Sequence, residues 1–180
     1  MTPDTALLNA AAVVLARNPG APLADIAAEA GIGRATLHRR YATRTDLLRA
    51  LALESLEQTE QVLAPLLTGD TRGADRLAAV ADALVPLGAR FHFLMSEIAI
   101  YDDPEVSGAY EAHLTRLGSL IESLKADDAL APDVPTAWGV IALDALVWGA
   151  WSAVEEGYLA RRDAPVLVTR TLLTGLSPSP

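Results

Sequence analysis

The stretch ADIAAEAGIGRATLHRRY, residues 24–41, contains two short helical patterns separated by a turn that holds two glycines. Small side chains at Ala27 and Ala30 allow two helices to come close together, and Gly31 tolerates the positive φ that a tight turn requires. Leu37 is placed to pack the second helix against the first at a fixed angle. These features predict a helix-turn-helix, in which the second helix keeps one free face.

The second helix, expected over residues 34–41, separates its apolar side chains from its polar ones. Leu37 and Tyr41 lie four residues apart and define the buried side. At about 100° per residue, the opposite side carries short polar and basic residues, among them Thr36 and Arg39. Arginine and histidine reach guanine edges or phosphates, and threonine contacts a phosphate or a thymine methyl group. A helix pair with a solvated arginine face would show the same alternation, so the pattern alone leaves that interpretation open.

The distribution of charge favours nucleic-acid binding. The formal net charge of -9 argues against indiscriminate binding to phosphate. Residues 1–50, however, hold six arginines against four acidic side chains, a net of +2, whereas the other 130 residues hold eight basic and nineteen acidic ones, a net of -11. We therefore expect a basic head on an acidic body. The expected DNA-binding residues are Arg34, Ala35, Thr36, His38, Arg39, Arg40, Tyr41 and Arg44.

Two of these arginines are expected to contact DNA phosphates. Arg40 lies nearer the buried edge of its helix. Arg44 follows Thr43, which forms a capping box with Asp46 and starts a further helix. At such a helix start, backbone N–H groups and a guanidinium can jointly bind one phosphate.

Helical patterns continue through the rest of the chain. Hydrophobic residues make up 51% of the sequence and aromatic ones only 5%, which favours helices over sheets. A first helix starts at Thr2-Pro3-Asp4 and stops before Asn18. Asp103 before Pro104 is a good helix start. The later helices are expected at residues 44–67, where Pro65 should disturb the end, and at 73–85, 87–101, 104–128, 135–160 and 164–174.

Several kinds of site are absent from the sequence. Without cysteine there are no disulfides, thiolate zinc sites or cysteine nucleophiles. The three histidines have no zinc-binding spacing, and we find no P-loop, dinucleotide-binding glycine motif or nucleophile elbow. We therefore expect no enzyme activity, no metal and no cofactor. Because we find neither a signal peptide nor a run of about 18 uninterrupted apolar residues, we expect a soluble, cytoplasmic protein without membrane contact.

The head resembles the DNA-binding domain of the TetR family of bacterial transcriptional repressors. The resemblance covers about residues 5–50 with unbroken spacing, and it is carried by Leu23, Ile26-Ala27, Ala30-Gly31-Ile32, Thr36-Leu37-His38, Tyr41, Arg44 and Leu47. Some positions depart from the family pattern. Pro22 replaces a capping Thr that often touches phosphate, and Gly33 replaces a capping Ser, which weakens the start of the second helix. Ala35 replaces a common Gly, and His38 and Arg40 replace the frequent Tyr and His.

The resemblance implies an all-α protein with a three-helix helix-turn-helix DNA-binding domain at residues 1–50. A larger helical effector-binding and dimerisation domain at residues 51–180 would follow. It also implies a homodimer formed through the last two helices, about residues 135–174. The residues support this point, because the helix that starts near Trp138 is apolar around most of its circumference, and Gly149 would let another helix approach closely.

The candidate ligand-binding residues lie in the body and are Phe91, His92, Met95, Tyr101, Asp144 and Trp148. His92, between two phenylalanines, fits either a core histidine bonded to a backbone carbonyl or a ligand-orienting group. Asp144 interrupts a long apolar stretch, so it must face solvent, pair across a dimer or contact a pocket. Met95 and Trp148 also fit a role in the core.

Taken together, these patterns predict a ligand-responsive transcriptional regulator. Its simplest form is a repressor that binds a palindromic operator in double-stranded DNA as a homodimer and is released by a small-molecule effector. The alternative is a helical small-molecule carrier or adaptor whose basic head docks on an acidic protein partner.

Overall fold

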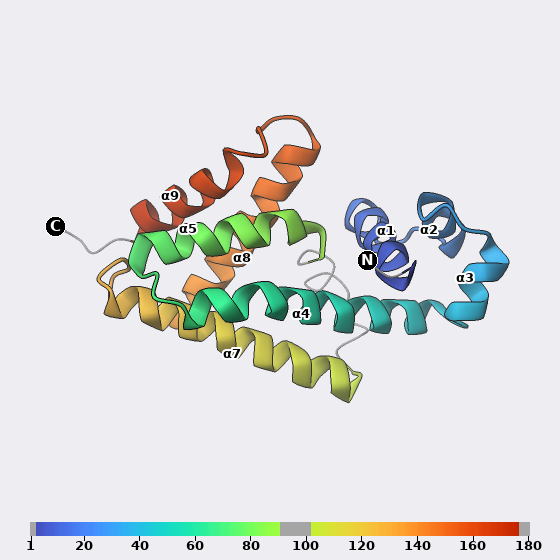
Figure 1. Ribbon diagram of the computed structural model, residues 1–180, viewed down its shortest axis with the longest axis horizontal. Helices are drawn as coiled ribbons and strands as arrows, with labels where there is room; N and C mark the ends of the chain where they lie inside the picture. Colours follow the sequence, from blue (N-terminus) through green and yellow to red (C-terminus); the bar gives the residue numbers. More distant parts are fainter. Residues whose placement is uncertain (1–2, 91–101, 177–180) are drawn as a thin grey trace. The chain divides into compact units, whose positions relative to one another are not determined.

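The computed structural model describes residues 3–90 and 102–176, and all regular structure within these ranges is helical (Figure 1). The predicted all-α fold is confirmed. The chain divides into two compact units, one formed by Met1–Gln58 with Ala89–Tyr110 and the other by Thr59–Gly88 with Glu111–Pro180. The expected domain boundary after residue 50 concerns function and stays a prediction.

The elements follow one another along the chain as helices of very different length. They are α1 (Pro3–Arg17), α2 (Leu23–Glu29), α3 (Arg34–Arg40), α4 (Arg44–Thr68), α5 (Gly73–Leu84), the 3-10 turn η1 (Val85–Leu87), α7 (Pro104–Ala126), α8 (Thr136–Glu155) and α9 (Ala164–Leu176). Most of the helix expected at residues 87–101 lies outside the described residues. Helix α4 continues for three residues beyond Pro65.

Two predicted helices were too long at their C-terminal ends. The helix expected to reach residue 128 ends at Ala126, and the one expected to reach residue 160 ends at Glu155. The second error has a clear cause, because Gly157 adopts a φ of +78°. The amide of Gly157 donates to the carbonyl of Val154 at 3.1 Å and that of Tyr158 to Ala153 at 2.8 Å, which closes the helix.

The first unit has one hydrophobic core, to which α1, α2, α3 and α4 all contribute. Leu37 of α3 is only 1% exposed and belongs to the same cluster as Ile26 and Ala27 of α2. Val106, at the start of α7, also lies in this cluster. The fully or nearly buried members are Leu7, Leu8, Ala11, Ala12, Leu15, Ile26, Ala27, Leu37, Leu47, Leu48, Leu51, Ala52, Leu56 and Val106.

The turn between α2 and α3 has the conformation that the sequence predicts. Gly31 has a φ of +66°. Its amide donates to the carbonyl of Ala28 at 3.1 Å, and the amide of Ile32 donates to that of Ala27 at 2.9 Å. This pair of bonds is a Schellman motif, which satisfies the last carbonyls of α2 and redirects the chain.

Side-chain caps start the two helices α4 and α7. The Thr43 amide donates to the Asp46 carboxylate at 2.9 Å, and the Asp46 amide donates to the Thr43 hydroxyl at 3.1 Å, so the predicted capping box of α4 is confirmed. Asp103 caps α7 by accepting the amides of Glu105 and Val106 at 3.0 and 3.1 Å. By contrast, Gly33 provides no side-chain cap for α3, as its lack of a side chain dictates.

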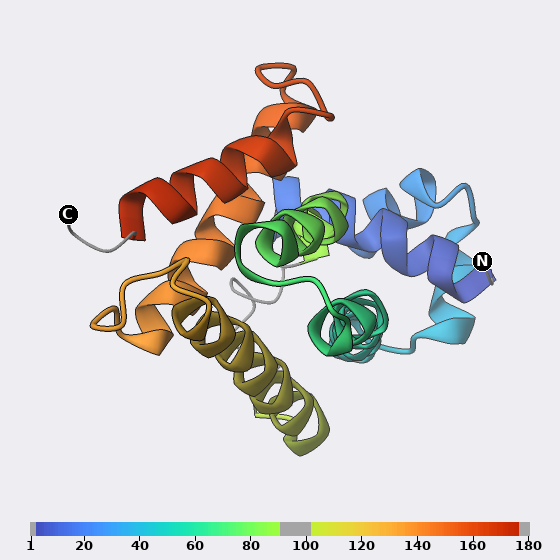
Figure 2. The ribbon, with the colours of Figure 1, turned by 60° about the vertical axis from the view of Figure 1, so that its left-hand side comes forward.

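In the second unit, α9 packs against both α5 and α8 (Figure 1 and Figure 2). Helix α5 buries Leu77, Val80 and Leu84 at helical spacing. Helix α8 buries Val140 and Val147 from its central part. Apolar side chains on one stripe of each helix therefore hold this unit together.

Among the described helices, α8 alone has the length and composition of a membrane span. The same properties are found in core helices of proteins that do not enter membranes, so this is weak evidence. One side of α8, which includes Leu143, Val147 and Trp151, is buried within the protein.

The two glycines around the turn provide a matched pair of substitutions. Gly31→Ser should lower the free energy of unfolding by about 1–2 kcal/mol, because an L side chain is strained at positive φ. Gly33 has a φ of -73°, and nothing lies within 4 Å of the position that a Cβ would take there. Gly33→Ser should therefore change the free energy by only a few tenths of a kcal/mol in the stabilising direction, roughly the N-cap difference between Gly and Ser. Urea unfolding of both variants measures the difference; equal effects would contradict the assigned turn.

Candidate functional site

Helix α3 exposes the face that the sequence pattern predicts for DNA contacts. Arg34, Ala35, His38 and Arg39 are exposed, and Thr36 is half-buried. Leu37, on the opposite side, is 1% exposed and fixes the rotation of the helix about its axis. The strip therefore presents two guanidinium groups, an imidazole and a hydroxyl, side chains that hydrogen-bond to phosphates and base edges.

Arg40 and Tyr41 lie at the edge of this strip and contact the first helix of the same unit. The Arg40 guanidinium forms an ion pair with Asp4 of α1, with an N–O distance of 2.8 Å. Tyr41 is half-buried, and burial, with a smaller contribution from the charge of Asp4, raises the pKa of its phenol. In the described structure Arg40 thus ties α3 to α1.

The Arg44 side chain points to backbone groups of the first unit. Its guanidinium donates to the carbonyl of Ala21 at 2.6 Å and to the carbonyl of Pro19. Both acceptors belong to the turn between α1 and α2. Arg44 therefore anchors that turn to the start of α4, a structural role that its sequence position did not reveal.

Arg49 also pairs with acidic side chains of the protein itself. Its guanidinium bonds to Asp103 at 2.7 Å and to Glu105, and these contacts raise its pKa while the bond from Arg49 holds the pKa of Asp103 below its usual value. Of the five arginines at residues 34–49, three thus have internal partners. Within the described residues, Arg34 and Arg39 make no ion pair with a carboxylate, so they are the cations most available to a polyanion.

A buried arginine in the first unit was not predicted from the sequence. Arg90 is 3% exposed, and its guanidinium bonds to Glu54 at 3.2 Å, to Ser55 at 2.9 Å and to Asn9. Burial lowers its pKa, and the charge of Glu54 partly offsets this effect. One signal was available, since a lone arginine in an apolar stretch needs an internal partner. The cluster joins residue 90 to both α1 and α4.

The predicted ligand-binding set is only partly visible. Phe91, His92, Met95 and Tyr101 lie outside the described residues. Asp144 and Trp148 are both on α8, where Asp144 is 8% exposed and Trp148 is half-buried. Of the three environments considered for Asp144, exposure to solvent is therefore wrong.

Asp144 is an unusual buried carboxylate. Its Oδ1 atom is inaccessible to solvent and has no hydrogen-bond partner among the described residues. Burial alone raises the pKa of this carboxyl group from 3.8 to about 7. A charged carboxylate in such surroundings is costly unless a partner arrives.

The second unit has another buried ionisable group, His113 on α7, whose pKa is lowered and not raised. It is 6% exposed, and burial, aided by the charge of Arg116, lowers its pKa to about 4. His113 is therefore neutral at neutral pH and contributes no charge to balance Asp144. No group of three potential metal ligands occurs in the described part of the chain.

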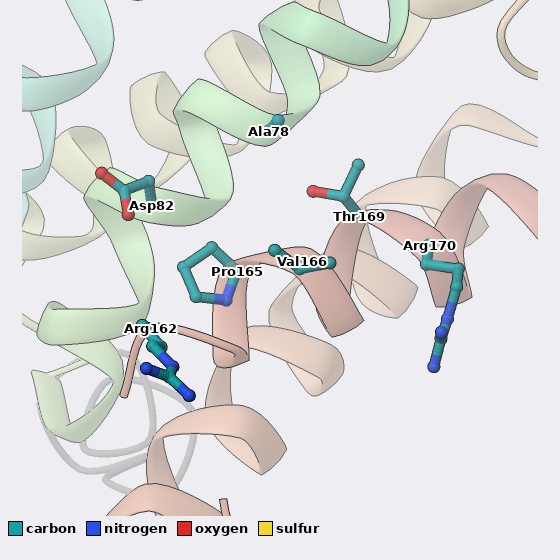
Figure 3. A pocket seen from close by; sticks show the side chains of 7 residues that line it. All are labelled: Ala78, Asp82, Arg162, Pro165, Val166, Thr169 and Arg170. Carbon is teal, nitrogen blue, oxygen red and sulfur yellow. The ribbon is translucent and has the colours of Figure 1, made fainter. Parts of the chain in front are cut away.

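A surface pocket of about 430 Å³ lies between α5 and α9 (Figure 3). It is lined by Ala78, Asp82, Arg162, Pro165, Val166, Thr169 and Arg170. Most of these residues are exposed, including Val166 at 63%, so the pocket is an open groove. Of the two predicted ligand-binding residues that the structure describes, Asp144 and Trp148, neither lines it.

Comparison with known proteins identifies the architecture. Residues 7–51 match the family model described as bacterial regulatory proteins, tetR family. The HTH-type transcriptional repressor LfrR of Mycolicibacterium smegmatis is 33% identical over 175 residues, covering 95% of this chain and 88% of that protein. The chain belongs to the TetR family.

Solved structures agree with this assignment across the full length. The crystal structure of the TetR-like regulator LfrR from Mycobacterium smegmatis in complex with proflavine matches with a TM-score of 0.75 at 30% identity and covers 99% of both chains. A second LfrR structure matches with a TM-score of 0.67 at 29% identity, covering 97% of this chain and 99% of that one. The protein is therefore a TetR-family transcriptional regulator and not an enzyme. The resemblance noted in the head is confirmed.

The environment of Asp144 predicts a pH-dependent effect of its removal. Because this carboxyl ionises near pH 4 in the unfolded chain and near pH 7 in the folded one, wild-type stability falls as the pH rises through that window. Asp144→Asn should therefore gain stability relative to wild type between about pH 5 and about pH 8, by at most about 3 kcal/mol. Thermal unfolding at both pH values measures the gain.

Asp82→Asn, which removes an exposed carboxylate from α5, is the control for loss of one negative charge. A stability difference between Asp144→Asn and wild type that is the same at both pH values would show that Asp144 is not buried in an apolar environment.

Proposed function

We propose that this regulator is a repressor that binds a palindromic operator as a homodimer and leaves it when a small molecule binds. In this proposal residues 1–50 form the DNA-binding domain and residues 51–180 bind the effector and form the dimer. The protein acts on double-stranded DNA in the cytoplasm. The exposed strip of α3, opposite the buried Leu37, is the observation that carries the proposal.

The contacts within the first unit support distinct roles for its cations. Arg34 and Arg39 are exposed on α3, and with Thr36 and His38 they would reach bases or phosphates in the major groove. Arg40 and Arg44 would contact phosphates only by exchanging or sharing their present partners, Asp4 and the carbonyls of residues 19 and 21. Ala35 would pack against a thymine methyl group or the DNA backbone, and Tyr41 would hold the edge of the helix.

The exposed side of α8 supports dimer formation through the last two helices. Trp138 and Ile141 are 54% and 53% exposed, and Ala145 and Gly149 continue the same exposed stripe at helical spacing. In a single chain this stripe leaves apolar side chains in water, and α9 likewise exposes Val166 at 63%. A second copy related by two-fold symmetry would cover the stripe and would place two copies of α3 for two half-sites.

Two observations support an effector in the body: the ligand complex of the relative LfrR, and the buried Asp144 carboxylate on α8, whose Oδ1 atom has no described partner. LfrR has been crystallised with proflavine, and the chain shares 30% identity with that structure over its whole length. A 10- to 100-fold loss of operator affinity requires about 1.4–2.8 kcal/mol of coupling between the sites. The ligand must supply it by binding more tightly to the released conformation than to the DNA-bound one.

The direct test is selection of genomic fragments by the purified protein, followed by sequencing. A shared palindromic motif, lost after addition of the effector, is the expected outcome. Recovery without a shared motif would instead support an adaptor whose basic head docks on an acidic protein.

Arg39→Ala should weaken binding to the selected duplex by about 1–3 kcal/mol if the side chain reads a base, without changing protein stability. Fluorescence anisotropy titration measures the affinity. Arg161→Ala, in the exposed loop after α8, changes the net charge equally and serves as the control. Equal affinities of the Arg39 and Arg161 variants would remove Arg39 from the DNA contacts.

Gly149→Arg should convert the dimer to a monomer, because it places a long charged side chain in the middle of the apolar stripe. Nothing lies within 4 Å of a Cβ at this position, so the single chain should tolerate the change. Gly108→Arg, on α7 with equally open surroundings, is the matched control. Sedimentation velocity distinguishes the two states, and a dimeric Gly149→Arg variant would exclude this face from the interface.

A further inference from the structure

Asp144, the one acidic residue in the central part of helix α8, lies on the buried face of that helix. Asp144 lies on the same stripe as Val140, Val147 and Trp151, all of which are buried. Its Oδ1 atom has no hydrogen-bond partner in the described residues. Buried polar groups in native proteins nearly always have a partner, so an orphaned carboxylate oxygen needs an explanation.

An aromatic pair follows Asp144 on the same stripe. Trp148 and Trp151 stack with their ring centroids 5.0 Å apart and an interplanar angle of 27°. Trp148 is one helical turn beyond Asp144 and Trp151 about two turns beyond it. Trp151 is packed closely by the backbone of Gly88, where any Cβ would overlap its side chain. The pair therefore includes one buried indole held by packing, Trp151, and one half-buried indole, Trp148.

These two features call for one ligand chemistry. A buried carboxylate without a partner is stabilised by a cation, since an ion pair with a good hydrogen bond offsets part of the cost of desolvation. Indole faces attract flat aromatic rings and cations through stacking and the ring quadrupole. A neutral donor could hydrogen-bond Oδ1 but would not balance its charge, and an aliphatic cation would lack the flat ring that stacks on an indole.

We propose that Asp144, with the Trp148–Trp151 pair, binds the cationic group of a planar aromatic effector. This inference rests on the proposed effector-binding function and specifies the chemical class of the effector and the residue that selects it. Asp144 supplies the charge recognition, and the indole of Trp148 supplies a stacking surface.

The geometry also separates this site from the groove between α5 and α9. That groove is lined by two arginines and one aspartate, so its fixed charge does not favour a cation. Within the described residues, no basic side chain forms an ion pair with Asp144. A cationic ligand would therefore supply the positive charge that pairs with the Asp144 carboxylate.

Tryptophan fluorescence offers a direct measurement. The chain has three tryptophans, and Trp138→Phe leaves the Trp148–Trp151 pair as the only indoles. In this background, we expect proflavine, a planar aromatic cation, to quench the remaining emission on titration. Relative to Trp138→Phe alone, Asp144→Asn in the same background should weaken proflavine binding at least tenfold while the circular dichroism spectrum stays unchanged.

Two controls isolate the charge. Asp82→Asn removes an exposed carboxylate from the same unit and should leave proflavine binding unchanged. Acridine, which has the same three-ring system but is largely uncharged at neutral pH, should bind wild type and Asp144→Asn alike.

Each outcome decides the matter. Proflavine binding that survives Asp144→Asn, or an equal loss for proflavine and acridine, overturns the role of Asp144 while the proposed effector function stands. If neither compound binds wild type while the protein still binds DNA, both the cation site and this effector class are rejected. If Asp144→Asn unfolds, Asp144→Glu, which keeps the charge, must retain the preference for proflavine over acridine.

Discussion

The burial of Leu37 is the constraint on which the exposed strip of α3, the proposed DNA-binding surface, depends. A seven-residue helix has too few internal hydrogen bonds to hold its own position, so α3 is placed by packing. The Schellman turn at Gly31 brings α3 against α2, and Leu37 then enters a core shared with α1 and α4. Once that side chain is buried, the rotation of α3 is fixed, and the side that carries Arg34, His38 and Arg39 has to face solvent.

The five arginines at residues 34–49 divide into two groups with different physical roles. Three of them satisfy partners inside the unit: Arg40 binds Asp4, Arg44 binds two carbonyls of a turn, and Arg49 binds Asp103 and Glu105. These exposed or half-exposed bonds contribute little energy singly, but each fixes the position of one segment. Arg34 and Arg39 are exposed and make no ion pair with a carboxylate within the described residues, which is why the proposal assigns them to DNA. A count of positive charges therefore overestimates the number of cations that the surface offers.

Helix α8 shows why an apolar helix can serve several purposes. One side, with Trp138, Ile141 and Gly149, is exposed in the single chain and forms the proposed dimer face. The other side is buried and contains both the hydrophobic packing of the unit and Asp144. A carboxylate on that side lowers stability at neutral pH. Such a cost is consistent with a binding role, because residues that serve a site are often unfavourable for folding.

Sequence periodicity determined the fold class, the helix-turn-helix, the exposed strip of α3 and the capping box, since each depends on residues within a few positions of one another. The ends of α7 and α8 were less well predicted, and in α8 the turn at Gly157 competes with a continuing apolar pattern. Only the tertiary structure showed that Arg90 is buried against Asn9 and Glu54, that Arg44 anchors a turn, and that Asp144 lacks a described partner. The physical reason is that the pairing of a charge depends on side chains brought together from distant parts of the chain, and local spacing does not encode which of them meet.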